Sequence, residues 1–476
     1  MSLNDLGGPL VLEVGLAVLI LVVFLVGLFM GKPDRRQVGV IAVIGLVVLL
    51  AIALRTSPGP PLLGGTFVQD EMALFAKRLF LVATIIGILG SLGLPSPTFA
   101  RRATEYHLAM LASLLGMLVL ASARELVLIF VAFELMSIPL YYLAGFLKRD
   151  ETAVEAALKF FLVGTVSSAV LVYGLSFVYG VAGTTDLRGV SRALEYGHPL
   201  ILLGMLLVLG GLGFKIAAFP FHMWVPDTYE AATTPFVAWL SVAPKAAGFV
   251  VIFRMYLEGV RDPVLLLWVP LAAGLAAITM IAGNLMAIPQ QNIKRLLAYS
   301  GIAHIGYILL GFAAVSANGV AMMLFYLVAY LFGNMGAFLV VQAVAQSDGS
   351  ESIAAYRGLA QRSPLLALWM LLFLLSLGGV PFVAGFWAKL YVFWAAADKG
   401  LYWLVLLGAI ITVVALFYYL LVVKRMYIDA PEKVGPVRVS PLLNLSILLC
   451  VLGTVGIGVY PKPLVMAALR AAGSLF

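Results

Sequence analysis

The sequence has 476 residues, of which 63% are hydrophobic and 11% charged, and its mean hydropathy is +1.09. Soluble domains carry about 25% charged residues, so this composition excludes a water-soluble fold and indicates a membrane protein. The net charge of +8 does not indicate nucleic-acid binding, because the basic residues are scattered in short loops. The single cysteine, Cys450, excludes a disulfide framework and a cysteine-ligated iron–sulfur cluster in this chain.

A membrane-spanning helix needs about 20 consecutive, mostly apolar residues. Fourteen runs meet this requirement, so we predict an all-α polytopic membrane protein without a soluble domain. The predicted spans are 9–30, 38–54, 74–95, 105–121, 125–146, 156–182, 199–224, 233–257, 264–285, 295–315, 319–345, 365–397, 401–424 and 439–459. The first run is too long for a signal-peptide core, so it is interpreted as the first span.

The distribution of lysine and arginine predicts the orientation of the chain. With the N-terminus outside, fifteen basic residues fall on the cytoplasmic side and eleven on the outer side. This bias favours a multi-pass membrane protein with both termini on the outer side. The remaining four basic residues lie inside predicted spans, and they are Lys159, Lys215, Lys245 and Lys389.

Ionisable groups inside a membrane are costly and commonly mark a transport path. Glu134 is nine residues beyond Glu125, which places it about 14 Å into a hydrocarbon core of about 30 Å. Lysine suits proton transfer because it can gain and lose a proton, whereas arginine stays protonated. The alternative is a structural salt bridge of Glu134, but one carboxylate leaves most of the lysines unpaired. For Lys159, near the start of its span, snorkelling to the interface is a further alternative.

Two prolines interrupt spans beside lysines: Pro220 follows Lys215, and Pro381 precedes Lys389. Proline removes a helical hydrogen bond, and broken helices at membrane depth are tolerated only where they are buried or line water. Two such breaks in corresponding halves indicate an inverted-repeat transporter, although simple packing kinks would also fit.

Histidine titrates near neutral pH, so a histidine inside the membrane is a candidate proton relay. His304 lies within a predicted span and His222 lies at the first break. For each, the alternative is a packing role with its hydrogen bonds satisfied. His107 and His198 lie near span ends and are predicted to be interfacial.

Six long motifs give the sequence a resemblance to a known family. They are FELMSIPLYYLAG (133–145), ALKFFLVGTVSSA (157–169), KIAAFPFHMWVPDTYE (215–230), SVAPKAAGF (241–249), NIKRLLAYSGIAHIGY (292–307) and SLGGVPFVAGFWAK (376–389). In these motifs the chain resembles the subunit N family of bacterial NADH-quinone oxidoreductase (respiratory complex I). The resemblance covers roughly residues 105–425.

The resemblance implies two inverted five-helix repeats, each with one broken helix. The implied parts are three N-terminal helices in 1–104, the first repeat in 105–258, the second in 259–425 and a C-terminal helix in 426–476. It further implies that Glu134 and Lys215 form an ion pair, that Lys245 lies on a central axis and that Lys389 is its counterpart in the second repeat. Lys159 matches a lysine often found in subunit N.

The implied function is proton translocation through the buried Lys and Glu residues, coupled to quinone reduction. This chain is expected to hold no cofactor or metal, whereas quinone, NADH, FMN and iron–sulfur clusters are expected in other subunits. The expected partners are an adjacent antiporter-like subunit, small membrane subunits and the lipid bilayer. The alternatives are a subunit of an Mrp-type cation/proton antiporter, a structural scaffold subunit and a stand-alone solute transporter.

Overall fold

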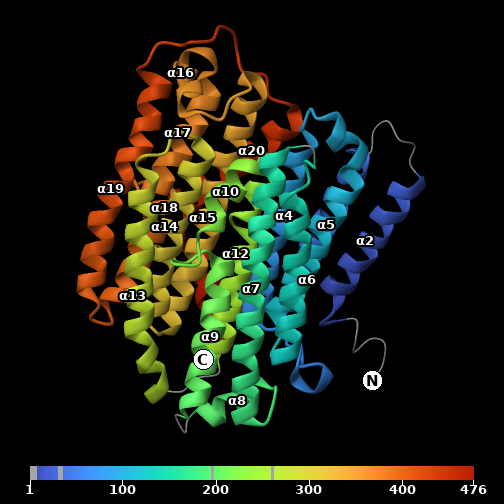
Figure 1. The fold of residues 1–476 in the computed structure, drawn as a ribbon, viewed down its shortest axis with the longest axis vertical. Helices are drawn as coiled ribbons and strands as arrows, with labels where there is room; N and C mark the ends of the chain where they lie inside the picture. The colour runs from blue at the N-terminus through green and yellow to red at the C-terminus, as the bar shows by residue number, and fades with distance from the viewer. Residues whose placement is uncertain (1–7, 30–35, 149, 195–197, 259–261) are drawn as a thin grey trace.

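The computed structural model describes residues 8–29, 36–148, 150–194, 198–258 and 262–476. Four of the loop cations counted for the orientation lie outside the described residues, and they are Lys32, Arg35, Arg149 and Arg261. The helices form an elongated bundle, and the start of α2 (Val11–Phe29) and the end of the chain lie toward the same end, here called the termini end (Figure 1). The short helix α16 (Leu359–Arg362) lies at the opposite end, here called the α16 end.

In the described part of the chain, thirteen helical segments are long and apolar enough to cross a membrane. They are α2, α3 (Arg36–Arg55), α4 (Glu71–Leu92), α5 (Pro97–Ser122), α6 (Leu126–Ala144), α7 (Glu151–Ala182), α9 (Pro199–Ile216), the segment formed by α11 (Thr234–Leu240), α12 (Ala243–Phe253) and the π-helical Arg254–Glu258, α13 (Asp262–Ala287), α14 (Ile293–Ala313), α15 (Ala317–Asp348), α19 (Tyr402–Tyr427) and α20 (Pro441–Val459). The remaining predicted span, 365–397, is divided into α17 (Pro364–Gly378) and α18 (Ala384–Ala397). The all-helical polytopic prediction is therefore confirmed.

Both predicted helix breaks are present. α9 ends at Ile216 and the short α10 (Trp224–Ala231) follows, so Pro220 lies in the intervening turn. α17 ends at Gly378 and α18 begins at Ala384, so Pro381 lies between them. The predicted span 233–257 is present as the candidate span Thr234–Glu258, but it contains a further break, because α11 ends before Ser241 and α12 begins after Val242.

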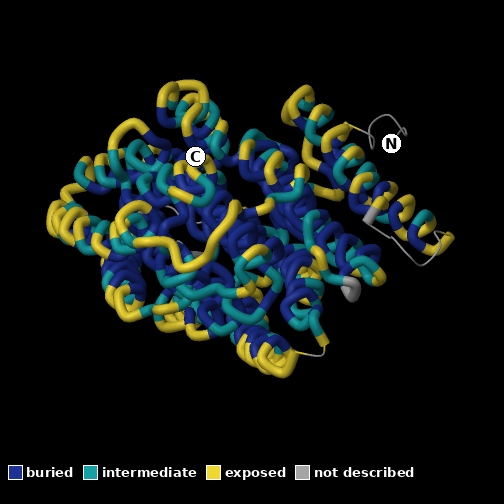
Figure 2. The backbone as a smooth tube through the Cα atoms, turned by 90° about the horizontal axis from the view of Figure 1, so that it is seen from above, coloured by how far each residue is buried: buried dark blue, intermediate teal, exposed yellow. Residues whose placement is uncertain are grey.

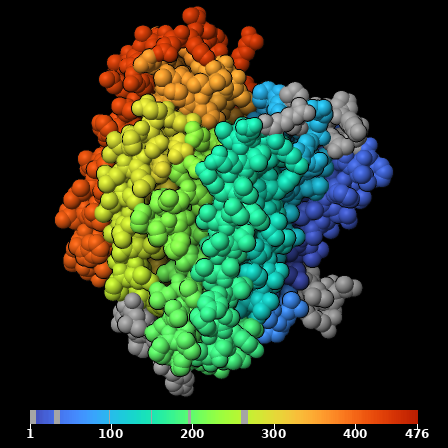
Figure 3. All heavy atoms as spheres, in the orientation of Figure 1, coloured from blue at the N-terminus to red at the C-terminus, as the bar shows by residue number. Residues whose placement is uncertain are grey.

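Burial divides the helices into a core and a periphery. α4, α11–α12, α14 and α15 are buried along most of their length, whereas α2, α3, α7, α19 and α20 expose many apolar side chains. Figure 2 shows the buried backbone gathered in the interior of the bundle and the exposed backbone around its outside. α7 (turquoise) and α13 (yellow) run along one broad face (Figure 3). On α7 the exposed residues include Leu158, Phe161 and Val166. Such an apolar outer face suits contact with lipid or with a neighbouring membrane subunit.

The same glycine contact occurs in two helix pairs. A Cβ on Gly116 of α5 would lie 2.4 Å from the backbone nitrogen of Met136 on α6. A Cβ on Gly283 of α13 would lie 2.4 Å from the backbone nitrogen of Ala303 on α14. In both pairs the partner is twenty residues further along the chain. The two helix pairs therefore approach each other in the same register, as two copies of one repeat would.

Candidate proton-transfer site

Lys215 lies in the last turn of α9, directly before the first break, and is buried. Its Nζ atom has no hydrogen-bond partner and lies 5.1 Å from the ring centre of Phe133 and 5.6 Å from that of Tyr141. The faces of aromatic rings attract an ammonium group, so this pocket can hold a charge without a carboxylate in contact.

Glu134 lies on α6 and accepts a hydrogen bond of 2.5 Å from the hydroxyl of Ser168 on α7. It is close enough to act electrostatically on Lys215, but the two do not form a direct ion pair in this structure. Tyr141 interacts electrostatically with Glu134 while its ring faces Lys215. Glu134 and Lys215, which the resemblance implies to be an ion pair, therefore interact electrostatically without direct contact. Tyr141 lies beside both, and sequence reasoning missed this residue.

Lys245 lies in the first turn of α12, just after the unpredicted break, and is buried. Its Nζ atom has no hydrogen-bond partner and lies 5.4 Å from the ring centre of Tyr229 on α10. At the break itself, the side-chain amide of Asn334 on α15 donates a hydrogen bond of 2.6 Å to Ser241. The break thus places the first turn of α12, and Lys245 with it, in the middle of the protein.

Lys389 lies on α18, beyond the second break, and is buried. Its Nζ atom donates a hydrogen bond of 3.2 Å to the carbonyl of Gly378, the last residue of α17. It also lies 4.6 Å from the ring centre of Tyr307. The lysine therefore binds the carbonyl that the broken helix leaves free.

His304 on α14 lies close enough to Lys245 and to Lys389 for both lysines to act on it electrostatically. Its Nδ1 atom is 2.7 Å from the hydroxyl of Tyr326, and its Nε2 atom is 3.3 Å from the hydroxyl of Tyr419. The Tyr419 hydroxyl is in turn 2.5 Å from the hydroxyl of Ser300. These contacts form a continuous buried network of hydroxyl and imidazole groups, which hydrogen bonding can use to pass a proton.

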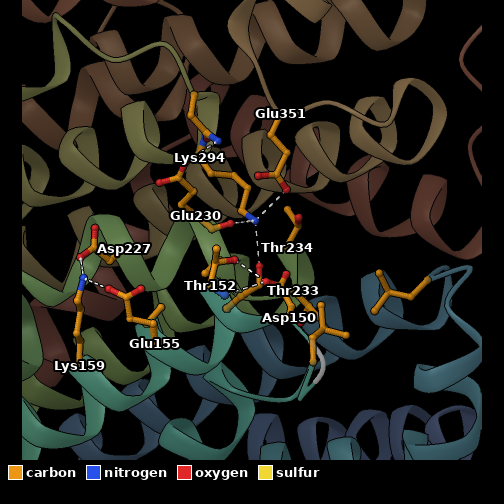
Figure 4. A pocket seen from close by; sticks show the side chains of 16 residues that line it. Asp150, Thr152, Glu155, Lys159, Asp227, Glu230, Thr233, Thr234, Lys294 and Glu351 are labelled. Atoms are coloured by element: carbon orange, nitrogen blue, oxygen red, sulfur yellow. Dashed lines mark hydrogen bonds and ion pairs between the residues drawn. The ribbon is translucent and has the colours of Figure 1, made fainter.

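The other two candidate relays, Lys159 and His222, differ in how far they are buried. The side chain of Lys159 is 50% exposed and forms ion pairs with Glu155 at 2.8 Å and with Asp227 at 3.2 Å (Figure 4). It therefore lies outside the buried set, as the snorkelling alternative predicted. His222 is buried at the first break, where its ring stacks on Phe219 and its Nδ1 atom has no hydrogen-bond partner.

His107, which the sequence predicts to be interfacial, is fully buried within α5 and forms a hydrogen bond of 3.1 Å with Ser91. Ser91 lies in the last turn of α4, so His107 lies level with a helix end but is covered by protein. His198 is exposed and caps the N-terminus of α9, as an interfacial residue can.

Sequence reasoning missed a buried group of charges at the termini end. The guanidinium of Arg254 donates to both carboxylate oxygens of Asp70, at 2.6 and 2.8 Å, and to Glu258 at 3.1 Å. Arg124 binds the same two carboxylates, at 3.0 and 2.5 Å. Burial opposes ionisation of Asp70, but the charges of Arg254 and Arg124, together with the hydrogen bonds from Arg254 and from the backbone of Ala73, outweigh this effect and lower the pKa of Asp70. We call these four residues the termini-end ion network.

Close by, Lys77 on α4 is fully buried and pairs with Glu13 on α2 at 2.6 Å. Lys77 and Arg254 belong to the eleven basic residues that the sequence places on the outer side, because both lie close to the predicted ends of their spans. Within the described residues, no group of three or more histidine, cysteine, aspartate or glutamate side chains is placed to hold a metal ion.

A membrane bundle with two broken helices, each beside a buried lysine, and a third lysine between them defines the antiporter-like class of membrane subunits. The family described as "NADH:quinone oxidoreductase/Mrp antiporter, TM" matches residues 123–415. NADH-quinone oxidoreductase subunit N of Moorella thermoacetica is 42% identical over 98% of this chain and 98% of the relative. The chain belongs to the NADH-quinone oxidoreductase subunit N family.

Solved structures agree with this assignment. A chain of respiratory complex I from Thermus thermophilus with bound aureothin is 32% identical, with a TM-score of 0.81 over 96% of this chain and 98% of that one. A chain of the Mrp complex from Dietzia sp. has a TM-score of 0.87 over 100% of this chain and 98% of that one, at 20% identity. The second likeness shows a shared fold alone.

Proposed function

We propose that this chain is the proton-translocating subunit N in the membrane arm of an NADH-quinone oxidoreductase. The observation that carries the proposal is the set of three buried lysines, Lys215, Lys245 and Lys389, of which none is ion-paired within the described part of the chain. An amine held in a low-dielectric interior without a fixed counter-ion can take up and release a proton as nearby charges change.

In the proposed path, protons pass from the cytoplasm toward the outer side through water-filled half-channels that meet at these lysines. Glu134, next to Tyr141, modulates the proton affinity of Lys215 electrostatically. The buried network around His304 carries the proton between Lys245 and Lys389. The energy comes from quinone reduction elsewhere in the complex, where other subunits hold quinone, NADH, FMN and iron–sulfur clusters.

The proposed arrangement divides the chain at about residues 104, 258 and 425, and the paired contacts of Gly116 and Gly283 support two repeats. The chain would lie in a bacterial inner membrane with the termini end outside. Its exposed apolar helices would contact lipid, an adjacent antiporter-like subunit and small membrane subunits.

The test measures protons pumped per quinone reduced by the purified complex in lipid vesicles. Lys215→Ala and Lys389→Ala should each reduce pumping at least tenfold with assembly intact. Lys399→Ala, which changes an exposed lysine in a loop, should not change it. Full pumping in both buried-lysine variants would contradict the proposal and would favour a scaffold role.

The shared fold with an Mrp complex supports a second candidate, a subunit of a cation/proton antiporter. That function predicts sodium-dependent proton flux in vesicles without NADH or quinone. Proton flux that needs quinone reduction and is independent of sodium would exclude the antiporter.

A further inference from the structure

An apolar groove of about 330 Å³ lies at the termini end of the bundle. It is bounded by α3 and by α21 (Lys462–Gly473), which both pack against α4, and by α15. Ten of its eleven lining residues are leucine, valine, phenylalanine or alanine, and the remaining one is Arg78 on α4. Leu54 on the rim is 65% exposed, so the groove opens on the outside of the bundle.

Arg78 lies level with the end of α3. Its Nε atom donates a hydrogen bond of 3.0 Å to the carbonyl of Ala53, and its Nη2 atom donates one of 3.2 Å to the carbonyl of Thr56. The candidate membrane span of α3 ends at Arg55, so Arg78 lies near the edge of the membrane-spanning region. Val82 follows Arg78 by one helical turn, so the apolar wall continues about 6 Å further into the membrane.

A second arginine lies close to Arg78. Arg470, in the last turn of α21, is exposed and acts on Arg78 electrostatically as a like charge. Glu71, at the start of α4, also acts on Arg78, but within the described part of the chain neither arginine forms an ion pair. The carbonyl groups that Arg78 binds are neutral, so they leave its positive charge uncompensated. This end of the groove therefore carries two positive charges that no described carboxylate pairs.

The cationic end and the apolar wall match the two parts of an anionic phospholipid. Guanidinium groups bind phosphate with charge-assisted hydrogen bonds, and basic pockets between transmembrane helices bind anionic head groups. The wall beyond the arginines lies at the depth of the hydrocarbon core, where an acyl chain can follow it. A lipid without net charge would leave both arginines uncompensated, and a free phosphate ion would leave the apolar wall uncovered.

We propose that this groove binds one anionic phospholipid, with the phosphate at Arg78 and Arg470 and an acyl chain along the apolar wall. The bound lipid joins α21 to α3, because its head group contacts an arginine of α21 while its chain lies against Leu50 of α3. It also supplies the negative charge that lets the two arginines lie close together. The site does not depend on proton translocation, so it can be tested separately from the proposed function.

The test uses the intact complex in phosphatidylcholine vesicles that contain a small fraction of a photoreactive lipid. Two probes carry a diazirine in the same acyl chain: phosphatidylglycerol, which is anionic, and phosphatidylcholine, which has no net charge. After illumination, mass spectrometry locates the labelled residues of this chain. The anionic probe should label the groove wall, at Leu79, Val82 or Leu464, at least fivefold more than the neutral probe, at about 1 kcal/mol for each cation near the membrane surface.

Three variants separate the site from general lipid contact, and Arg78 stays unchanged in all of them because it also binds the end of α3. Arg470→Gln should lower groove labelling by the anionic probe about fivefold, the effect of one cation. Ala467→Phe fills the groove but keeps both arginines, so it should lower labelling by both probes. Arg192→Gln, on α8 (Leu187–Leu194), removes an exposed arginine at the same end and should change nothing (Figure 1).

Equal labelling of the groove by the two probes would show ordinary lipid contact and would overturn the proposal. So would unchanged labelling by the anionic probe in both Arg470→Gln and Ala467→Phe. A groove that neither probe labels in the intact complex would show that a neighbouring subunit covers it, which also overturns the proposal.

Discussion

The termini-end ion network should be a major source of stability, and Arg254→Met tests this. The guanidinium is fully buried and binds both carboxylate oxygens of Asp70, the carboxylate of Glu258 and the carbonyl of Ala121. Methionine keeps much of the volume but leaves two buried carboxylates with Arg124 as their one remaining arginine partner in the network. Removing one member of a buried ion pair costs about 3–5 kcal/mol.

This loss corresponds to a decrease of about two to three and a half orders of magnitude in the ratio of folded to unfolded protein, at about 1.4 kcal/mol per factor of ten. The assay is equilibrium unfolding of the purified complex in mixed micelles with a rising fraction of sodium dodecyl sulfate. Arg102→Met is the matched control, because it breaks a partly exposed pair with Glu105 that should contribute about 1 kcal/mol or less. If the two variants unfold at the same detergent fraction, the reasoning about the network is refuted.

Three further variants test other parts of the structure. Because the pKa of Asp70 is lowered from 3.8, its stabilisation is present above that pH and is lost as the pH falls through the lowered value. Acid should therefore destabilise wild type more than Asp70→Asn in detergent unfolding as the pH falls below 3.8. Gly385→Ala should reduce the yield of assembled complex, because its Cβ would lie 1.8 Å from the carbonyl oxygen of Ser376, whereas Gly180→Ala meets nothing within 4 Å and should assemble normally. His304→Gln should lower proton pumping in vesicles at least tenfold without loss of assembly, and unchanged pumping would remove this histidine from the path.

The membrane class and the three deep lysines were predictable because hydrophobic run length is a strong local signal. Lys215, Lys245 and Lys389 each lie many residues inside an apolar run, so no choice of boundaries moves them into a loop. The breaks at Pro220 and Pro381 were predictable for a similar reason, since proline acts on its own helix.

Features that depend on contacts between distant segments could not be predicted. Lys77 and Lys294 lie within two turns of a helix start, where sequence alone does not distinguish a buried side chain from a solvated one. Their partners Glu13 and Glu351 are more than fifty residues away. The break after Ser241 was missed because the run 233–257 stays apolar throughout, and hydropathy does not record backbone direction.

The hydrogen bond from Lys389 to the carbonyl of Gly378 joins the charge of an amine to the end of a helix. The C-terminus of α17 carries a partial negative charge, roughly half an electron, which an ammonium group at that carbonyl offsets. In the proposed function, release of the proton from Lys389 would remove this compensation, and the helix end would lose its cationic cap. The proposed cycle would therefore change the electrostatic force on the C-terminus of α17 each time the lysine gains or loses a proton.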